Sequence, residues 1–103
     1  MELSNSRLNL HNTLLRFCNN VYFQPPASVK LKYPCIIYEL DDIEKLNASN
    51  IGYKIDHRYS ITYITKDPVD NVIDELVKLQ MCVFERYFVS DNLHHYNYTI
   101  YYK

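Results

Sequence analysis

Apolar residues recur at helical spacing near the start of the chain. Between residues 4 and 18, Leu10, Leu14 and Phe17 follow the interval that aligns side chains on one face of a helix. This pattern predicts a first helix over residues 4–18. A second helix is predicted to begin at Asp67, because an acidic cap followed directly by proline is a common helix start.

The predicted strands differ in how their two faces are patterned. Residues 55–65 alternate apolar and polar side chains, which is the period of a half-buried strand. Residues 35–40 are almost continuously apolar and are predicted to be covered on both faces. Residues 21–24 are followed by two prolines, which cannot donate to a ladder, so this short strand either lies at a sheet edge or leaves the sheet there. Two further strands, 81–89 and 93–102, are predicted on either side of a turn.

These elements give the order α-β-β-β-α-β-β within a single domain spanning residues 1–103. The economical arrangement is an α+β fold. It consists of a mainly antiparallel sheet of about five strands with both helices packed on one face.

A polar stretch lies between the second and third predicted strands. Residues 41–54 hold mostly acidic, amide and other polar side chains, together with the one glycine of the chain. We interpret them as a long loop within a hairpin. Because loops beyond about 12 residues are uncommon unless they have a function, we expect this one to contact a neighbouring subunit. The candidate contact residues in it are Asp41, Asp42, Glu44, Lys45, Asn50 and Tyr53.

The net charge, the single glycine and the cysteines argue against several classes of function. The formal net charge of −1 argues against a footprint for duplex DNA, which is usually strongly basic. With one glycine, a backbone cradle for phosphate is hard to build. Three scattered cysteines, in a chain without an export or membrane signal, indicate reduced and mostly buried thiols and a protein made in cytoplasm.

No arrangement of residues indicates catalysis. His94 and His95 are adjacent, so in a strand their rings point to opposite faces and cannot share a metal ion. Pairing of His57 across the sheet with one of them stays open, although no local ligand spacing supports a metal site. The acidic run at 41–44 is interpreted as a solvated turn, because it lacks the calcium-loop pattern. We therefore expect a non-enzymatic protein with no metal and no cofactor.

Two surface features have alternative interpretations. Lys30 and Lys32 have the composition of a local basic patch, but a short charge run is more often only a solvated segment. Tyrosines gather near the C-terminus, which is one feature of a sheet that stacks nucleic-acid bases. Such a sheet also needs lysine and arginine interleaved with the aromatic residues. Only Lys103 lies near them, so core packing and subunit contacts explain these tyrosines better.

Four segments together make the chain similar to a known family. They are residues 20–26 (NVYFQPP), 33–38 (YPCIIY), 59–64 (YSITYI) with the Asp-Pro pair at 67–68, and 91–95 (DNLHH) before an aromatic last strand. On these segments, and over nearly all of the chain from residue 14 onward, it resembles the small tail-completion or tail-terminator proteins of long-tailed bacteriophages and prophages. The segments are not catalytic motifs.

The resemblance implies a fold like that of the lambda-type tail terminator, with two helices packed on a sheet in this same order. It also implies a virion protein of the head–tail junction, assembled in the host cytoplasm. Such proteins form a ring, here expected to be a homo-hexamer, that ends the tail tube and joins the tail tube protein to the head connector or stopper protein. DNA would pass through this ring without sequence-specific binding, and no membrane is involved. The chain departs from this picture in having no clearly basic segment to face the DNA channel.

A ring of this kind closes through two unlike patches on each subunit, because head-to-tail contacts are heterologous. We expect the 41–54 loop to form one patch, and the segments 24–33 and 90–95 to form the other contacts. Two alternatives stay open: another neck component, stopper or adaptor, and a small non-virion module that binds one protein partner. The candidate interface residues in segments 24–33 and 90–95 are Gln24, Pro25, Pro26, Lys30, Lys32, Asp91, Asn92 and His94.

Overall fold

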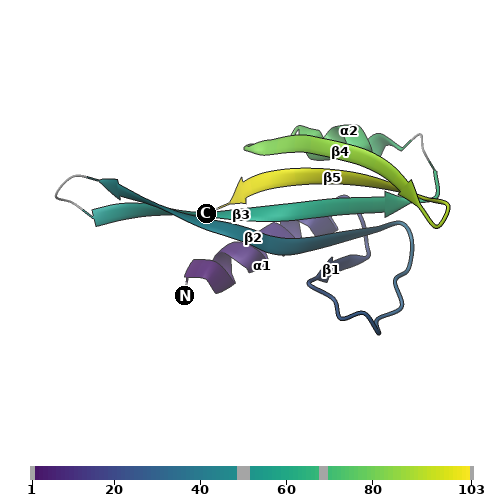
Figure 1. The fold of residues 1–103 in the computed structure, drawn as a ribbon, viewed down its shortest axis with the longest axis horizontal. Coiled ribbons are helices and arrows are strands. Elements are labelled where there is room, and N and C mark those ends of the chain that lie inside the picture. Colours follow the sequence, from purple (N-terminus) through teal and green to yellow (C-terminus); the bar gives the residue numbers. More distant parts are fainter. Residues whose placement is uncertain (1, 49–51, 68–69, 103) are drawn as a thin grey trace.

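The computed structural model describes residues 2–48, 52–67 and 70–102. Figure 1 shows one sheet with both helices behind the same face. The predicted α+β class and the order α-β-β-β-α-β-β are confirmed. In chain order the elements are α1 (Glu2–Leu15), β1 (Val21–Phe23), β2 (Cys35–Ala48), β3 (Gly52–Thr65), α2 (Asn71–Val77), β4 (Cys82–Ser90) and β5 (Leu93–Tyr102).

The five strands lie in the order β1-β2-β3-β5-β4. β1 runs parallel to β2, with Val21 opposite Ile36, and the other three pairs are antiparallel. The sheet is therefore mainly antiparallel, as predicted. The three-residue β1 lies at one edge, as the prolines that follow it indicate, and β4 lies at the other.

Tyrosine and leucine fill the space between the sheet and the helices. Four of the fully buried side chains are tyrosines from β2, β3 and β5, and leucines from both helices pack against them. The apolar face predicted for 55–65 is thus the face that the helices cover. The central members of this cluster are Leu10, Leu14, Tyr38, Tyr59, Ile61, Tyr63, Leu76 and Tyr98.

Hydroxyls of two buried tyrosines, Tyr38 and Tyr98, join the sheet to the helices. Tyr98 donates to the carbonyl of Ile73 in α2 at 2.9 Å. The Tyr38 hydroxyl lies 2.8 Å from Nδ1 of His11 in α1. A buried tyrosine needs such a partner, because an unpaired hydroxyl loses its hydrogen bonds to water without replacement. The core is therefore apolar in its interior and hydrogen-bonded at the helix layer.

The helix boundaries differ from the sequence-based prediction. α1 ends at Leu15, not at residue 18, and Leu15 is 41% exposed. α2 begins at Asn71, with Asp70 as its N-cap, so the predicted start at Asp67 is wrong. Asp70 takes the capping position because its carboxylate accepts a backbone amide of the first turn at 2.9 Å and also the hydroxyl of the core residue Tyr63. Residues 68–69 lie outside the described residues.

The polar stretch 41–54 is not the long loop that its composition predicts. β2 continues to Ala48 and β3 begins at Gly52, so the two strands extend as an antiparallel ribbon. The register shifts at a β-bulge between Leu40 and Asp42 and then runs on to the pair of Ala48 with Gly52. The prediction fails because a ribbon that leaves the helix-covered part of the sheet needs no alternation of apolar residues. Residues 49–51 lie outside the described residues.

Candidate interaction surfaces

The ribbon projects past the rest of the sheet. β5 pairs with β3 only from residue 57 onward, so within the described chain 52–56 pairs with 44–48 alone. We call these two segments, 44–48 and 52–56, the arm. Figure 1 shows the arm extending well beyond the helices and the other strands, and the molecule measures 52 × 27 × 22 Å along its principal axes. Of the predicted contact residues, Glu44, Lys45 and Tyr53 lie in the arm, and Asn50 lies outside the described residues.

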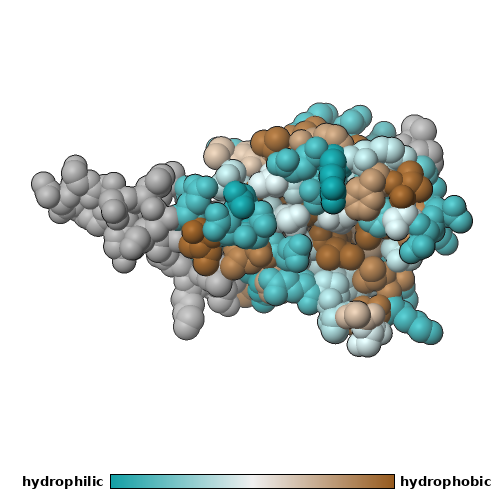
Figure 2. All heavy atoms as spheres, in the orientation of Figure 1, coloured by the Kyte–Doolittle hydropathy of each residue, from teal (hydrophilic) through white to brown (hydrophobic). Residues whose placement is uncertain are grey.

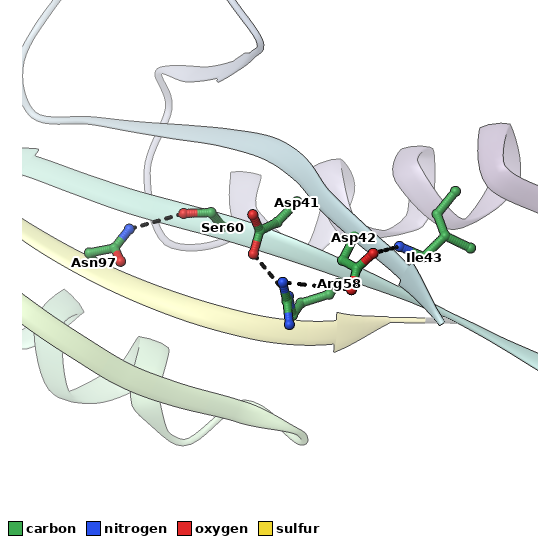
Figure 3. Close-up of polar contacts among 6 residues, drawn as sticks. All are labelled: Asp41, Asp42, Ile43, Arg58, Ser60 and Asn97. Atoms are coloured by element: carbon green, nitrogen blue, oxygen red, sulfur yellow. Dashed lines mark hydrogen bonds and ion pairs between the residues drawn. The ribbon is translucent and has the colours of Figure 1, made fainter. Parts of the chain in front are cut away.

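An ion-pair cluster lies at the base of the arm (Figure 3). Arg58 of β3 places Nε 2.9 Å from Oδ2 of Asp41 and Nη2 3.7 Å from Oδ2 of Asp42. Asp42 also accepts the amide of Ile43 at 2.8 Å. Hydrogen bonding to Tyr101, and then the charge of Asp41, raise the pKa of Arg58 above its usual value, against the opposing effect of desolvation. The predicted solvated turn is instead an ordered cluster in which the protein supplies its own cation.

A polar groove crosses the helix-free face of the sheet beside this cluster. At its centre Asn97 of β5 donates to Ser60 Oγ and to Thr62 Oγ1, both at 3.1 Å (Figure 3 draws the first of these bonds). Asp41 and Arg58 line the same groove. The groove thus contains charges of both signs, and the side-chain amide of Asn97 joins β5 to β3 by hydrogen bonds.

The segment 24–33 lies beside the β1–β2 pair. Gln24 has a φ of 44°, donates its amide to the Tyr38 carbonyl at 3.0 Å, and accepts the Leu40 amide on Oε1 at 3.2 Å. Gln24 therefore extends the pairing of the edge strand and has a structural role. Among the other candidates of this segment, Pro25 is half-buried, and Pro26, Lys30 and Lys32 are exposed, as Gln24 is.

The β4–β5 connection is a two-residue hairpin turn. Asp91 and Asn92 have φ values of 53° and 63°, and two successive positive φ values are what a type I′ turn requires. Beyond the turn, Nδ1 of His94 lies 2.7 Å from the hydroxyl of Tyr87, and the two rings stack with centroids 5.9 Å apart. The turn candidates are therefore exposed at the tip and anchored to β4 just behind it.

The histidines do not come together. His94 stacks on Tyr87 on one face of the sheet, whereas His95 stacks on Phe88 on the other. His57 lies opposite Tyr102, at the other end of the β3–β5 pair, so the suggested pairing of His57 with either of them is wrong. Among the described residues, no group of three metal-ligating side chains gathers.

The predicted surfaces occupy separate parts of the molecule. The arm forms one end, and the 24–33 segment and the β4–β5 turn lie toward the opposite end (Figure 1). These last two are not adjacent, because β1 and β4 are opposite edges of the sheet with three strands between them. The structure thus separates the arm from both other segments and separates those segments from each other.

Sequence reasoning missed a further surface along β4. Met81 is 60% exposed, Val83 56% and Val89 55%, and Phe84 and Tyr87 are also exposed. Figure 2 shows apolar atoms along the upper rim, where Figure 1 places β4. The sequence signal is the presence of apolar residues at both odd and even positions from 81 to 89. That signal becomes informative only once the strand order places β4 at an edge.

The functional conclusion rests on the surfaces described above. No family model matches the chain, and no curated protein matches it. None of the helices in the described part of the chain is long and apolar enough to cross a membrane.

Proposed function

We propose that the protein is a structural component of the head–tail junction of a long-tailed bacteriophage. In this proposal six copies form a ring that ends the tail tube and joins it to the head connector. The observation that carries the proposal is the arm, a two-stranded ribbon that stands clear of the core at one end of the molecule. The resemblance of the sequence to tail-completion proteins supports the same function.

A closed ring needs two unlike patches on each subunit. The arm has five residue pairs beyond the last pair of β3 with β5, and at about 3.4 Å per residue it reaches about 17 Å. That reach is comparable to the 22 to 27 Å thickness of the molecule, so an arm can lie across much of a neighbouring copy. The 24–33 segment and the β4–β5 turn, at the other end, then contact the tube and the connector.

The arm offers backbone groups as well as side chains. Among the described residues its two strands pair only with each other, so each has an outer row of N–H and C=O groups available to a strand of another subunit. The Arg58–Asp41–Asp42 cluster restrains the ribbon where it leaves the sheet. A restrained arm loses less conformational entropy on binding than a mobile loop of the same length.

Passage of DNA through the ring without sequence-specific contact is consistent with the charge of the chain. The formal net charge is −1, and the groove on the helix-free face combines Asp41 and Glu85 with Arg58 and Arg86. A surface of mixed sign does not accumulate the phosphate contacts that hold DNA in place.

Shortening the arm tests the assignment. Replacing residues 45–55 with Asn-Gly keeps Glu44 opposite Asp56 and supplies a type I′ turn, so the register of β2 and β3 is preserved. We expect this variant to fail to form rings with tail tube protein in mass photometry and to fail to join tails to heads. Arg16→Ala, an exposed change on the helix side, is the control and should behave as the original chain. Normal rings and normal joining by the shortened chain would rule out the arm as a ring contact.

The position of the protein in purified particles tests the function itself. We expect labelled protein at the tail–head junction. A label elsewhere in the particle would contradict the proposal, and a particle without label would favour a non-virion module that binds one protein partner.

A further inference from the structure

One edge of the sheet is open over most of its length. β4 is nine residues long and, within the described chain, pairs with β5 alone. Beyond Cys82, whose amide donates to the Leu79 carbonyl at 3.1 Å, its outer row of backbone N–H and C=O groups therefore faces solvent. Exposed apolar side chains flank that row on both faces of the sheet, among them Val83, Phe84, Tyr87 and Val89. An exposed, apolar edge strand of this length is a template for pairing with another strand.

The opposite edge is protected. β1 is only three residues long and is followed by Pro25 and Pro26, which cannot donate to a ladder. Beyond β1, the amide of Leu40 is already held by Gln24 Oε1 at 3.2 Å, and the amide of Ile43 by Asp42 Oδ1 at 2.8 Å. Because the β1 edge cannot accept a nine-residue strand and each strand of the arm has only five residues, the partner that fits the β4 edge is the β4 edge of a second copy.

The centre of β4 carries an acid and a base side by side. Glu85 and Arg86 are exposed, and within the described residues no ion pair joins either of them to another side chain. A charge in the middle of an edge strand normally discourages pairing, because like charges meet when the strand pairs with itself. An adjacent acid and base behave differently, because in antiparallel self-pairing each lies opposite its counter-charge.

We propose that β4 pairs antiparallel with β4 of a second copy of this chain, about a two-fold axis that passes between Glu85 and Arg86. Glu85 of each copy then lies opposite Arg86 of the other, and two ion pairs form. The two five-stranded sheets join into one continuous sheet. Counted outward from the axis, the other opposed residues are Phe84 with Tyr87, Val83 with Phe88, and Cys82 with Val89.

A β-bulge in β4 makes this register sterically consistent. Opposed side chains of an antiparallel pair lie on the same face, whereas residues three apart in a regular strand lie on opposite faces. The register shift between Phe84 and Arg86 adds one residue to β4. Phe84 lies opposite Tyr98, and Tyr87 lies opposite Tyr96, so Phe84 and Tyr87 both face the helix side. In the proposed dimer they therefore meet on one face, and without the bulge they would not.

Charge exchange tests the register. We expect light scattering of the full chain, from about 5 to 500 μM, to show a concentration-dependent dimer that is weak, because one strand edge buries less than the roughly 1,200 Å² of stable interfaces. Glu85→Arg and Arg86→Glu each place like charges opposite each other twice, and each should weaken the dimer about tenfold or more. The double variant E85R/R86E restores opposite charges and should dimerise within about threefold of the original chain.

Mixing the two single variants gives a second readout. A chain with Glu85→Arg presents two bases and a chain with Arg86→Glu presents two acids, so their mixture should form a heterodimer that neither forms alone. Arg16→Glu, just after the end of α1, makes the same change in net charge as Arg86→Glu and should leave dimerisation unchanged. A chain that stays monomeric at every concentration overturns the proposal. So does a dimer that the single reversals do not weaken or that the double exchange does not restore.

Discussion

Tyr98 illustrates how a single polar atom is held in the core. Its side chain is fully buried, and its hydroxyl donates to the carbonyl of Ile73 at 2.9 Å. We expect Tyr98→Phe to lower the free energy of unfolding by about 1 kcal/mol, because the ring still packs but this hydrogen bond is lost. Tyr33→Phe, at a partly exposed ring, is the matched control and should change stability little. Urea unfolding measures both, and equal effects of the two changes would contradict the role of the Tyr98 hydroxyl.

One buried and one half-buried thiol make the free energy of unfolding depend on pH in the alkaline range. Burial raises the pKa of Cys35 from 9.0 to about 12, and that of Cys82 from 9.0 to about 11. In the unfolded chain these thiols lose their protons near pH 9, while the folded chain keeps them, so the unfolded state binds fewer protons above that pH. The free energy of unfolding should therefore fall as pH rises from about 9 toward 11. Cys82→Ala should make this fall shallower in unfolding curves taken across that range, and an unchanged slope would show that Cys82 does not contribute.

At the scale of elements, the carboxylate of Asp70 stabilises the start of α2. Asp70 accepts the amide of Val72 at 2.9 Å and the hydroxyl of Tyr63, so it both caps the helix and joins it to β3. We expect Asp70→Ala to lower the free energy of unfolding by about 2 kcal/mol, since a lost N-cap costs about 1 kcal/mol and the Tyr63 hydroxyl also loses its partner. Asn71→Ala, at the exposed next residue, should have a small effect. Chemical denaturation compares the two, and a similar loss in both would argue against the cap.

The elements also show where sequence patterns stop being informative. The alternation over 55–65 correctly predicts that part of β3, because helices cover one face of the sheet there. The arm and the start of α2 are missed for local reasons: polar ribbon residues resemble a loop, and Asp67 resembles a cap as closely as Asp70 does. The open edge at β4 is missed for a different reason, since which strand is outermost depends on pairings between distant segments. The separation of the predicted interface segments at opposite edges of the sheet has the same cause.

At the scale of the whole molecule, the proposed ring and the proposed two-fold dimer need different kinds of contact. The β4 contact is isologous and closes after two copies, whereas ring contacts are heterologous and need two unlike patches. The arm is formed by β2 and β3, and β4 lies at the sheet edge beyond β5, so the two contacts use different surfaces. Chains with reversed charges at Glu85 or Arg86 should therefore keep their ring contacts, and a chain with a shortened arm should still dimerise.

Independence of the two surfaces requires that the arm contribute little to the stability of the remaining domain. Within the described chain, the two strands of the arm pair only with each other. We therefore expect replacement of residues 45–55 by Asn-Gly to change the free energy of unfolding by less than about 1 kcal/mol, because the lost ladder is partly offset by closing a shorter loop. Urea unfolding of the shortened and original chains measures this difference. A loss of several kcal/mol would mean that the arm supports the core, and a failure of the shortened chain to form rings would then reflect an unstable fold instead of a missing contact.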